Sequence, residues 1–173
     1  EIYFNNADWP TNNNKLWQNG IDGKWSQMFY DIDGGWSYLG TSFNALHRAL
    51  SDNGTAQAAP YATMLLRKLM EAPEFQEDFL ARMACLMNND FSEETLTEGV
   101  EIYKAKYFNA IPEHIERWGN PINADVWENK VQTMVVFAAY RKDYMIDHIN
   151  AEFSIDFIPE DYECIEEEDP PVE

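Results

Sequence analysis

Four polar residues near the start of the chain have the types and order needed for metal-assisted transfer to a hydroxyl group. Asp8 is followed five positions later by Asn13, and Asp31 and Asp33 come directly before two glycines. A carboxylate can orient a hydroxyl group and accept its proton. Carboxylate and amide oxygens are the hard ligands that Mg²⁺ prefers. Each residue taken alone is better explained by turn chemistry, because Asp and Asn often bond to their own backbone. Only in combination with further motifs does the joint pattern favour a site over turn chemistry.

Two local elements would have to position these residues. The Asn-rich residues 4–14, with Pro10, predict a loop. Residues 15–18 and 24–31 read as strands joined by a glycine-containing connection, which is typical of a β-hairpin. We expect this hairpin to carry Asp31 back toward the loop that holds Asp8.

Three short segments carry a resemblance to a known family. They are residues 6–17 (NADWPTNNNKLW), 23–25 (GKW) and 30–35 (YDIDGG). They resemble the CotH family of spore-coat-protein-H-like atypical kinases, which shows N-x-DWP-x-NN-x-K-x-(W/Y), GKW and YD-x-D-(F/G)-G segments. Weaker similarity continues through a leucine-rich and PEF-containing helix pair and a P-x-H-I-x-R-W segment. The resemblance covers about residues 4–153.

The resemblance implies roles for the four residues, in the order found in protein kinases. Asp8 matches the catalytic Asp. Asn13, with Asn12 as a close competitor, and Asp31 match the residues that hold the metal on the nucleotide, and Asp33 can share that metal. The implied cofactors are ATP with Mg²⁺ or Mn²⁺, and the implied partner is a protein substrate with a Ser hydroxyl.

The chain also departs from the kinase pattern. Gly34 stands where many family members have Phe. No glycine-rich loop and no phosphate-gripping Lys precede Asp8, although kinases carry both upstream of the catalytic loop. We therefore expect the carboxy-terminal lobe of a longer kinase domain whose amino-terminal lobe is missing. Alone it should be inactive as a kinase, bind ATP weakly and expose apolar surface beside Trp9, Trp17 and Trp36.

The fold class expected is mainly α with a small amino-terminal hairpin, resembling the C-lobe of an atypical protein-kinase-like fold. Helical periodicity and capping residues such as Ser42 and Ser92 predict about six helices, over about 42–50, 61–70, 73–87, 92–110, 124–140 and 144–153, and the chain restarts at Pro112. Residues 1–158 would form the lobe. Residues 159–173, which are acidic and Pro-containing, would form a disordered tail or linker.

Composition excludes some partners. The net charge of −19, from 31 acids and 12 bases, argues against nucleic acid and anionic membrane surfaces. No apolar run is long enough for a membrane span. Cys85 and Cys164 are far apart in dissimilar surroundings, and we predict neither a disulfide nor a zinc site. The residues do not indicate a compartment; the resemblance implies a bacterial cell-surface, extracellular or spore-coat protein.

Two other functions fit the residues. A degenerate kinase acting as a surface or assembly binding module would explain Gly34. A carbohydrate-active or carbohydrate-binding domain would use carboxylates together with stacking tryptophans, as Trp9, Trp17, Trp25 and Trp36 surround the candidate site in sequence. Asp31 and Asp33 do not begin an EF-hand, because Ser42 stands where such a loop requires Glu.

Overall fold

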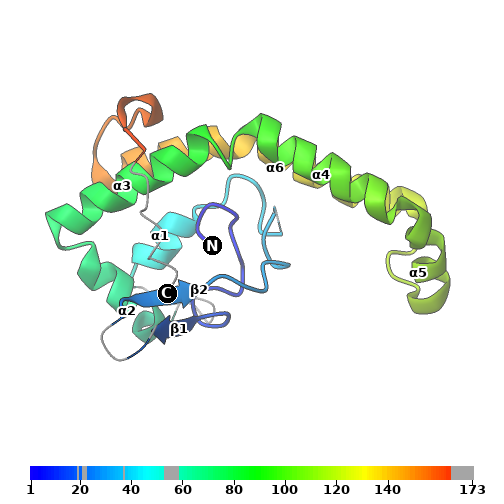
Figure 1. The fold of residues 1–173 in the computed structure, drawn as a ribbon, viewed down its shortest axis with the longest axis horizontal. Coiled ribbons are helices and arrows are strands. Elements are labelled where there is room, and N and C mark those ends of the chain that lie inside the picture. The colour runs from blue at the N-terminus through cyan, green and yellow to red at the C-terminus, as the bar shows by residue number, and fades with distance from the viewer. Residues whose placement is uncertain (19, 21–22, 37, 53–58, 165–173) are drawn as a thin grey trace.

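The computed structural model describes residues 1–18, 20, 23–36, 38–52 and 59–164. It is mainly helical with one small hairpin near the amino terminus, as expected (Figure 1). The strands are β1 (Lys15–Gln18) and β2 (Trp25–Met28). The α-helices are α1 (Ala45–Leu50), α2 (Pro60–Leu69), α3 (Pro73–Asn88), α4 (Glu93–Tyr107), α5 (Ile111–Trp118) and α6 (Ala124–Phe153). Two 3-10 turns, η1 (Phe108–Ala110) and η2 (Pro159–Asp161), complete the described elements.

Polar caps begin several of these helices. The Ser92 hydroxyl accepts a hydrogen bond from the Thr95 amide at the start of α4, as its sequence predicts. Asn123 caps α6 in the same way. Pro73 occupies the first turn of α3, where its missing N–H costs nothing. Asn44 rather than Ser42 caps α1, so this helix begins later than expected.

Helix α6 corrects one prediction. Two helices were expected over residues 124–140 and 144–153, but α6 runs without a break for 30 residues. No Gly or Pro lies between Ala124 and Phe153, so nothing in the backbone forces a stop. The continuous helix lets one element contact both the amino-terminal loop and the distant α5.

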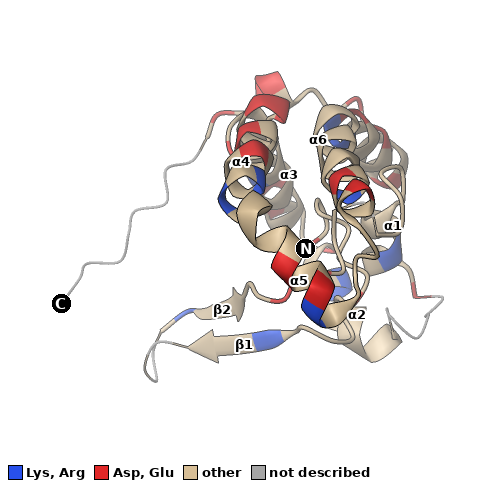
Figure 2. Ribbon diagram, turned by 90° about the vertical axis from the view of Figure 1, so that its right-hand side faces the viewer, with Lys and Arg blue, Asp and Glu red and all other residues tan. Residues whose placement is uncertain are grey.

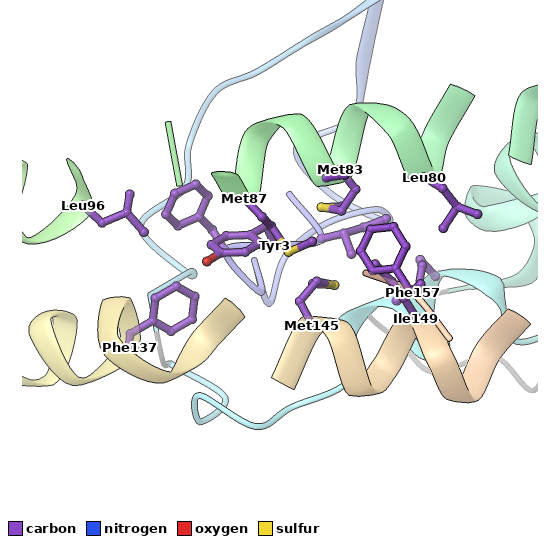
Figure 3. Close-up of a cluster of buried hydrophobic side chains, with 14 of the residues drawn as sticks. Tyr3, Leu80, Met83, Met87, Leu96, Phe137, Met145, Ile149 and Phe157 are labelled. Carbon is purple, nitrogen blue, oxygen red and sulfur yellow. The ribbon is translucent and has the colours of Figure 1, made fainter. Parts of the chain in front are cut away.

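The core lies where α3, α6 and the amino-terminal loop meet. Figure 3 shows Tyr3 from the loop between Met83 and Met87 of α3 and Phe137 and Met145 of α6. All five side chains are buried. The loop therefore supplies part of the core itself, although it contains no helix or strand.

Beyond the core, α4 and the first half of α6 run side by side as an arm with α5 at its tip (Figure 1). The arm exposes several large apolar side chains: Ile102, Tyr103, Tyr107, Phe108, Trp118 and Ile122. An apolar cavity of about 390 Å³ lies between α4 and α6 and is bordered by Trp36. Among the described residues of α5 none is buried.

The hairpin confirms the first predicted strand over its full length and the second in a shorter form. Its strands pair antiparallel, with Lys15 opposite Met28 and Gln18 opposite Trp25. The second strand ends at Met28, three residues before Asp31, so Asp31 lies in the segment that returns from the hairpin. β2 is exposed along its length.

The cysteine prediction was wrong. Cys85 on α3 and Cys164 form a disulfide, with Cα atoms 5.1 Å apart. The intervening helices return the chain to α3, and sequence separation says nothing about such a return. The structured part also extends past the expected boundary at residue 158: Pro159 is buried, its carbonyl accepts a hydrogen bond from Asn88, and η2 packs on α3. The expected disorder of residues 165–173 lies outside the described residues.

Charge is distributed unevenly along the chain. Residues 1–70 contain six acids and five bases, whereas residues 71–173 contain 25 acids and seven bases. Figure 2 shows acidic residues along the helices and a basic residue on β1. In the described part of the chain, no helix combines the length and the apolar character that crossing a membrane would need.

Candidate active site

The loop that carries Asp8 is buried almost throughout. Residues 2–7, Trp9 and Pro10 are buried, and Asp8 alone in this stretch is exposed. A buried loop must find partners for its backbone carbonyls, because a buried unpaired carbonyl is costly. Two arginines from distant helices supply many of these partners.

Arg141 of α6 is fully buried and binds backbone oxygens from two segments. Its Nε donates to the Tyr3 carbonyl at 2.6 Å, and one terminal nitrogen donates to the Ile2 carbonyl at 3.1 Å. The other terminal nitrogen donates to the carbonyls of Thr41 and Phe43 at 2.7 and 2.9 Å. Burial lowers the pKa of Arg141 to about 10. The guanidinium thus joins the start of the chain to the segment before α1.

Arg48 of α1 binds the loop on both sides of Asp8. Its terminal nitrogens donate to the carbonyls of Ala7 at 3.3 Å and Trp9 at 3.0 Å, and also to the carbonyl of Asn6. Burial lowers the pKa of Arg48, and the charge of the Asp8 carboxylate partly opposes this effect. Arg48 therefore fixes the backbone from which the Asp8 side chain projects.

The turn that carries Asp31 is hydrogen-bonded to the same loop. The Asn13 side-chain amide donates to the Asp31 carbonyl at 2.9 Å, and the Asn6 amide donates to the same oxygen at 3.1 Å. The Ala7 amide donates to the Gly34 carbonyl at 3.0 Å. The side-chain oxygen of Asn6 accepts the Asp8 amide at 3.1 Å, so Asn6 links both segments.

Two glycines allow the close approach. A Cβ atom at Gly35 would lie 2.9 Å from the Phe4 carbonyl oxygen, closer than such contacts normally occur. A Cβ at Gly34 would lie 3.1 Å from the Asn6 side-chain oxygen and 3.5 Å from an Asp8 carboxylate oxygen. The absence of Phe at position 34 therefore matches a turn that packs against the Asp8 loop.

The backbone is left-handed at several non-glycine positions of this site. Asn13 and Asp31 have φ of 53° and 57°, and Asn5 and Trp36 have φ of 61° and 49°. Asn and Asp tolerate this conformation better than other residues, whereas a bulky Trp there is uncommon. The Trp36 amide donates to the Phe4 carbonyl at 2.9 Å, and its ring lies 4.7 Å from the Phe4 ring, which holds it in place.

Comparison with known proteins decides the family. The chain matches the family described as CotH kinase protein over residues 1–145. This chain is a member of the CotH kinase family. No curated protein and no solved structure matches it. The family suggests a kinase-like function with a protein substrate, and the matched region contains every residue of the candidate site.

In this CotH kinase family member, the segments of all four predicted site residues lie together. Asn13 contacts Asp31, but through the Asp31 backbone carbonyl rather than its carboxylate. Asp8, Asp31 and Asp33 are exposed, and Asn13 is half-buried. The predicted roles of these residues stay predictions. What the hydrogen bonds establish is that the loop and the turn form one unit.

The donor set can be compared with what a divalent cation needs. Among the described residues there is no group of three or more His, Cys, Asp or Glu that could hold a metal ion. Asp31 and Asp33 offer carboxylates. The amide nitrogen of Asn13 donates to the Asp31 carbonyl, which leaves the Asn13 side-chain oxygen as a further ligand. Such a small set of hard oxygens fits Mg²⁺, which usually keeps several waters and takes other ligands from substrate phosphates.

The tryptophans near the candidate site differ in exposure. Trp9 itself is buried, with 6% of its surface exposed, although apolar side chains beside it, such as Leu16 and Leu65, are exposed. Trp17 and Trp25 on the hairpin are 49% and 66% exposed. A cavity of about 600 Å³ between the hairpin and α2 is bordered by Trp9 and Trp25, and its described walls include none of the candidate acids.

Sequence reasoning missed the residues that hold the site together. Asn6, Arg48 and Arg141 are all internal hydrogen-bonding centres, yet we expected no role in the site for any of them. One signal was available: Arg141 lies four residues after Phe137 and four before Met145, on the buried stripe of α6. A basic side chain on an apolar helical stripe is buried, so it must find hydrogen-bond acceptors inside the protein.

Proposed function

We propose that this chain provides the catalytic loop and the metal-binding turn of an ATP-dependent protein kinase that transfers phosphate to Ser hydroxyls. The described part of the chain would form the larger lobe of a kinase-like fold. One observation supports this proposal above the others. The Asp31–Asp33 turn is hydrogen-bonded to the Asp8 loop through the amides of Asn6 and Asn13, so acids separated by a hairpin share one surface.

Each residue has a role in this proposal. Asp8, exposed on a backbone that is fixed on both sides, orients the acceptor hydroxyl and takes its proton. Asn13, Asp31 and Asp33 hold Mg²⁺ or Mn²⁺ with the nucleotide phosphates. When bound there, the metal would neutralise part of the negative charge of the phosphates. Asn6 keeps the two groups of residues at a constant separation, because it bonds to both segments.

The test is phosphate transfer from labelled ATP by the full-length protein, with Mg²⁺ or Mn²⁺ and a Ser-containing protein substrate. We expect Asp8→Asn to lower kcat by about 100-fold or more, the usual contribution of a positioned proton acceptor. Asp31→Asn should abolish the metal-dependent rate. Asp90→Asn, which changes an exposed acid between α3 and α4, is the matched control and should leave the rate unchanged. Equal transfer by wild type and Asp31→Asn would exclude the proposed site.

A second function is favoured by the sparse metal donors. In the described residues, no group of three or more His, Cys, Asp or Glu side chains could hold a metal ion. The chain therefore also fits a degenerate kinase that serves as a binding module. This alternative predicts no transfer by the wild type under any metal. It also predicts that Asp8→Asn and Asp31→Asn leave partner binding intact.

A further inference from the structure

We propose that Arg48 is a positioning residue for phosphoryl transfer, which fixes the direction of the Asp8 carboxylate by holding the backbone carbonyls on both sides of it. This inference rests on the proposed function of Asp8. It assigns to α1 a part in the reaction, although α1 contributes no residue to the predicted site.

The geometry limits how the Asp8 backbone can move. The carbonyls of Ala7 and Trp9, which flank Asp8, are both bound by Arg48. The Asp8 amide is bound by the side chain of Asn6, whose own carbonyl is also bound by Arg48. With these peptide groups fixed, rotation of its own side chain is the main freedom left to Asp8.

The guanidinium group is suited to this task. Its planar fork presents several N–H donors in fixed directions, so one side chain can hold three carbonyls at once. A Lys ammonium is a single point charge on a flexible stem and cannot match the spacing of three acceptors. Arg48 is therefore not interchangeable with Lys here, although both carry the same charge.

A purely structural role makes different predictions. Arg48 also lies over the Phe43 ring, 5.3 Å from its centre, and any large side chain could fill this space. If packing were its only role, Arg48→Met would leave catalysis intact. If stability were its only role, rates would fall no further than in another variant of equal stability. Arg67 on α2 is the matched comparison, because it binds the Pro60 carbonyl and the Thr63 hydroxyl away from the site.

The experiment measures kcat and KM of the full-length protein for wild type, Arg48→Lys and Arg67→Lys. We expect Arg48→Lys to lower kcat by about 100-fold, the usual effect of a small misplacement of a reacting group, with KM for ATP nearly unchanged. Arg67→Lys should leave both constants close to wild type. Addition of low millimolar methylguanidinium to Arg48→Ala should restore part of kcat. An unchanged kcat in Arg48→Lys would overturn the inference, as would an equal loss in Arg67→Lys.

A second measurement separates this inference from the proposed function. Hydrogen exchange at the amides of Ala7 and Asp8 should be faster in Arg48→Lys and unchanged in Arg67→Lys. If the wild type transfers no phosphate, the proposed function fails, and exchange alone then decides whether Arg48 holds the loop. Unchanged exchange at Asp8 would overturn that holding role, whatever the activity of the wild type.

Discussion

The amino-terminal loop and helix α5 are opposites in this molecule. Residues 2–7 form no helix or strand, yet all of them are buried. Helix α5 is regular over eight residues, yet none of its residues is buried. The difference shows that regular secondary structure and burial are separate properties here. The loop is ordered by side chains that reach it from α1 and α6, whereas α5 contacts α6 without burying any of its own residues.

The two regions also differ in charge. The first 70 residues, which contain the candidate site, are nearly balanced, and the remaining residues carry almost all of the net negative charge. A nucleotide triphosphate is itself strongly negative, and exposed like charges repel mainly at short range in physiological salt. The candidate site therefore lies in the part of the chain that opposes a triphosphate least.

The largest effect should follow from Arg141→Met, which tests whether a buried arginine orders the loop. Four hydrogen bonds to backbone carbonyls are lost. The Ile2 and Phe43 carbonyls keep a backbone donor each, but the loop loses the side chain that joins it to the segment before α1. We expect the free energy of unfolding to fall by about 4 kcal/mol. Urea unfolding followed by tryptophan fluorescence measures this. Arg117→Met on the exposed α5 should change it by less than about 0.5 kcal/mol. Equal losses would contradict the contrast between the two regions.

A pair of glycine substitutions should have moderate and opposite effects. Gly35→Ala places a Cβ atom against the Phe4 and Ile32 carbonyls of the site, and we expect a loss of about 2 kcal/mol. Gly99→Ala on α4 meets nothing within 4 Å and should add about 0.5 to 1 kcal/mol through helix propensity. Thermal unfolding of both variants gives the sign directly. A stabilising Gly35→Ala would mean that the turn does not pack on the loop as described.

The smallest effect concerns His148 on α6, which lies where that helix meets the segment before α1. Burial and the charge of Arg141 lower its pKa, and the Ser42 backbone and Asp147 partly oppose the shift. At pH values between the lowered pKa and the ordinary value of 6.5, the unfolded chain therefore binds more protons than the folded one. The free energy of unfolding falls as the pH falls through this range. We expect His148→Gln to flatten the decline between about pH 7 and 5, by less than about 1 kcal/mol because His148 is partly exposed. Unfolding measured at a series of pH values checks this, and an unchanged slope would contradict it.

Local features of the fold were predictable from the sequence. The hairpin, the Ser92 cap and the start of α3 at Pro73 each depend on residues that are close in sequence. The features that escaped prediction depend on residues far apart. Arg141 bonds to residues about 100 to 139 positions away, and the two cysteines are 79 positions apart. Single-sequence patterns contain no information about such distances.

The candidate site was predictable in the same limited sense. The hairpin explains why Asp31 returns toward the Asp8 loop, and motif order selected the four candidates, whose roles stay predictions. The sequence did not indicate that Asn13 would bond to the Asp31 backbone, or that both residues would have left-handed backbone. Nor did it indicate that Trp9 would be buried, since exposed and core tryptophans look alike in a single sequence.

The disulfide divides the chain topologically. Cys85 and Cys164 are the only cysteines, and the arm of α4, α5 and the first half of α6 lies wholly within the covalent ring that they close. When a protease cuts the arm, the disulfide still joins the two fragments. In a denatured sample they therefore migrate as separate fragments only after reduction. A cut before Cys85 releases the fragment that carries the candidate site with or without reductant. Paired reducing and non-reducing gels therefore report separately on damage to the arm and to the site.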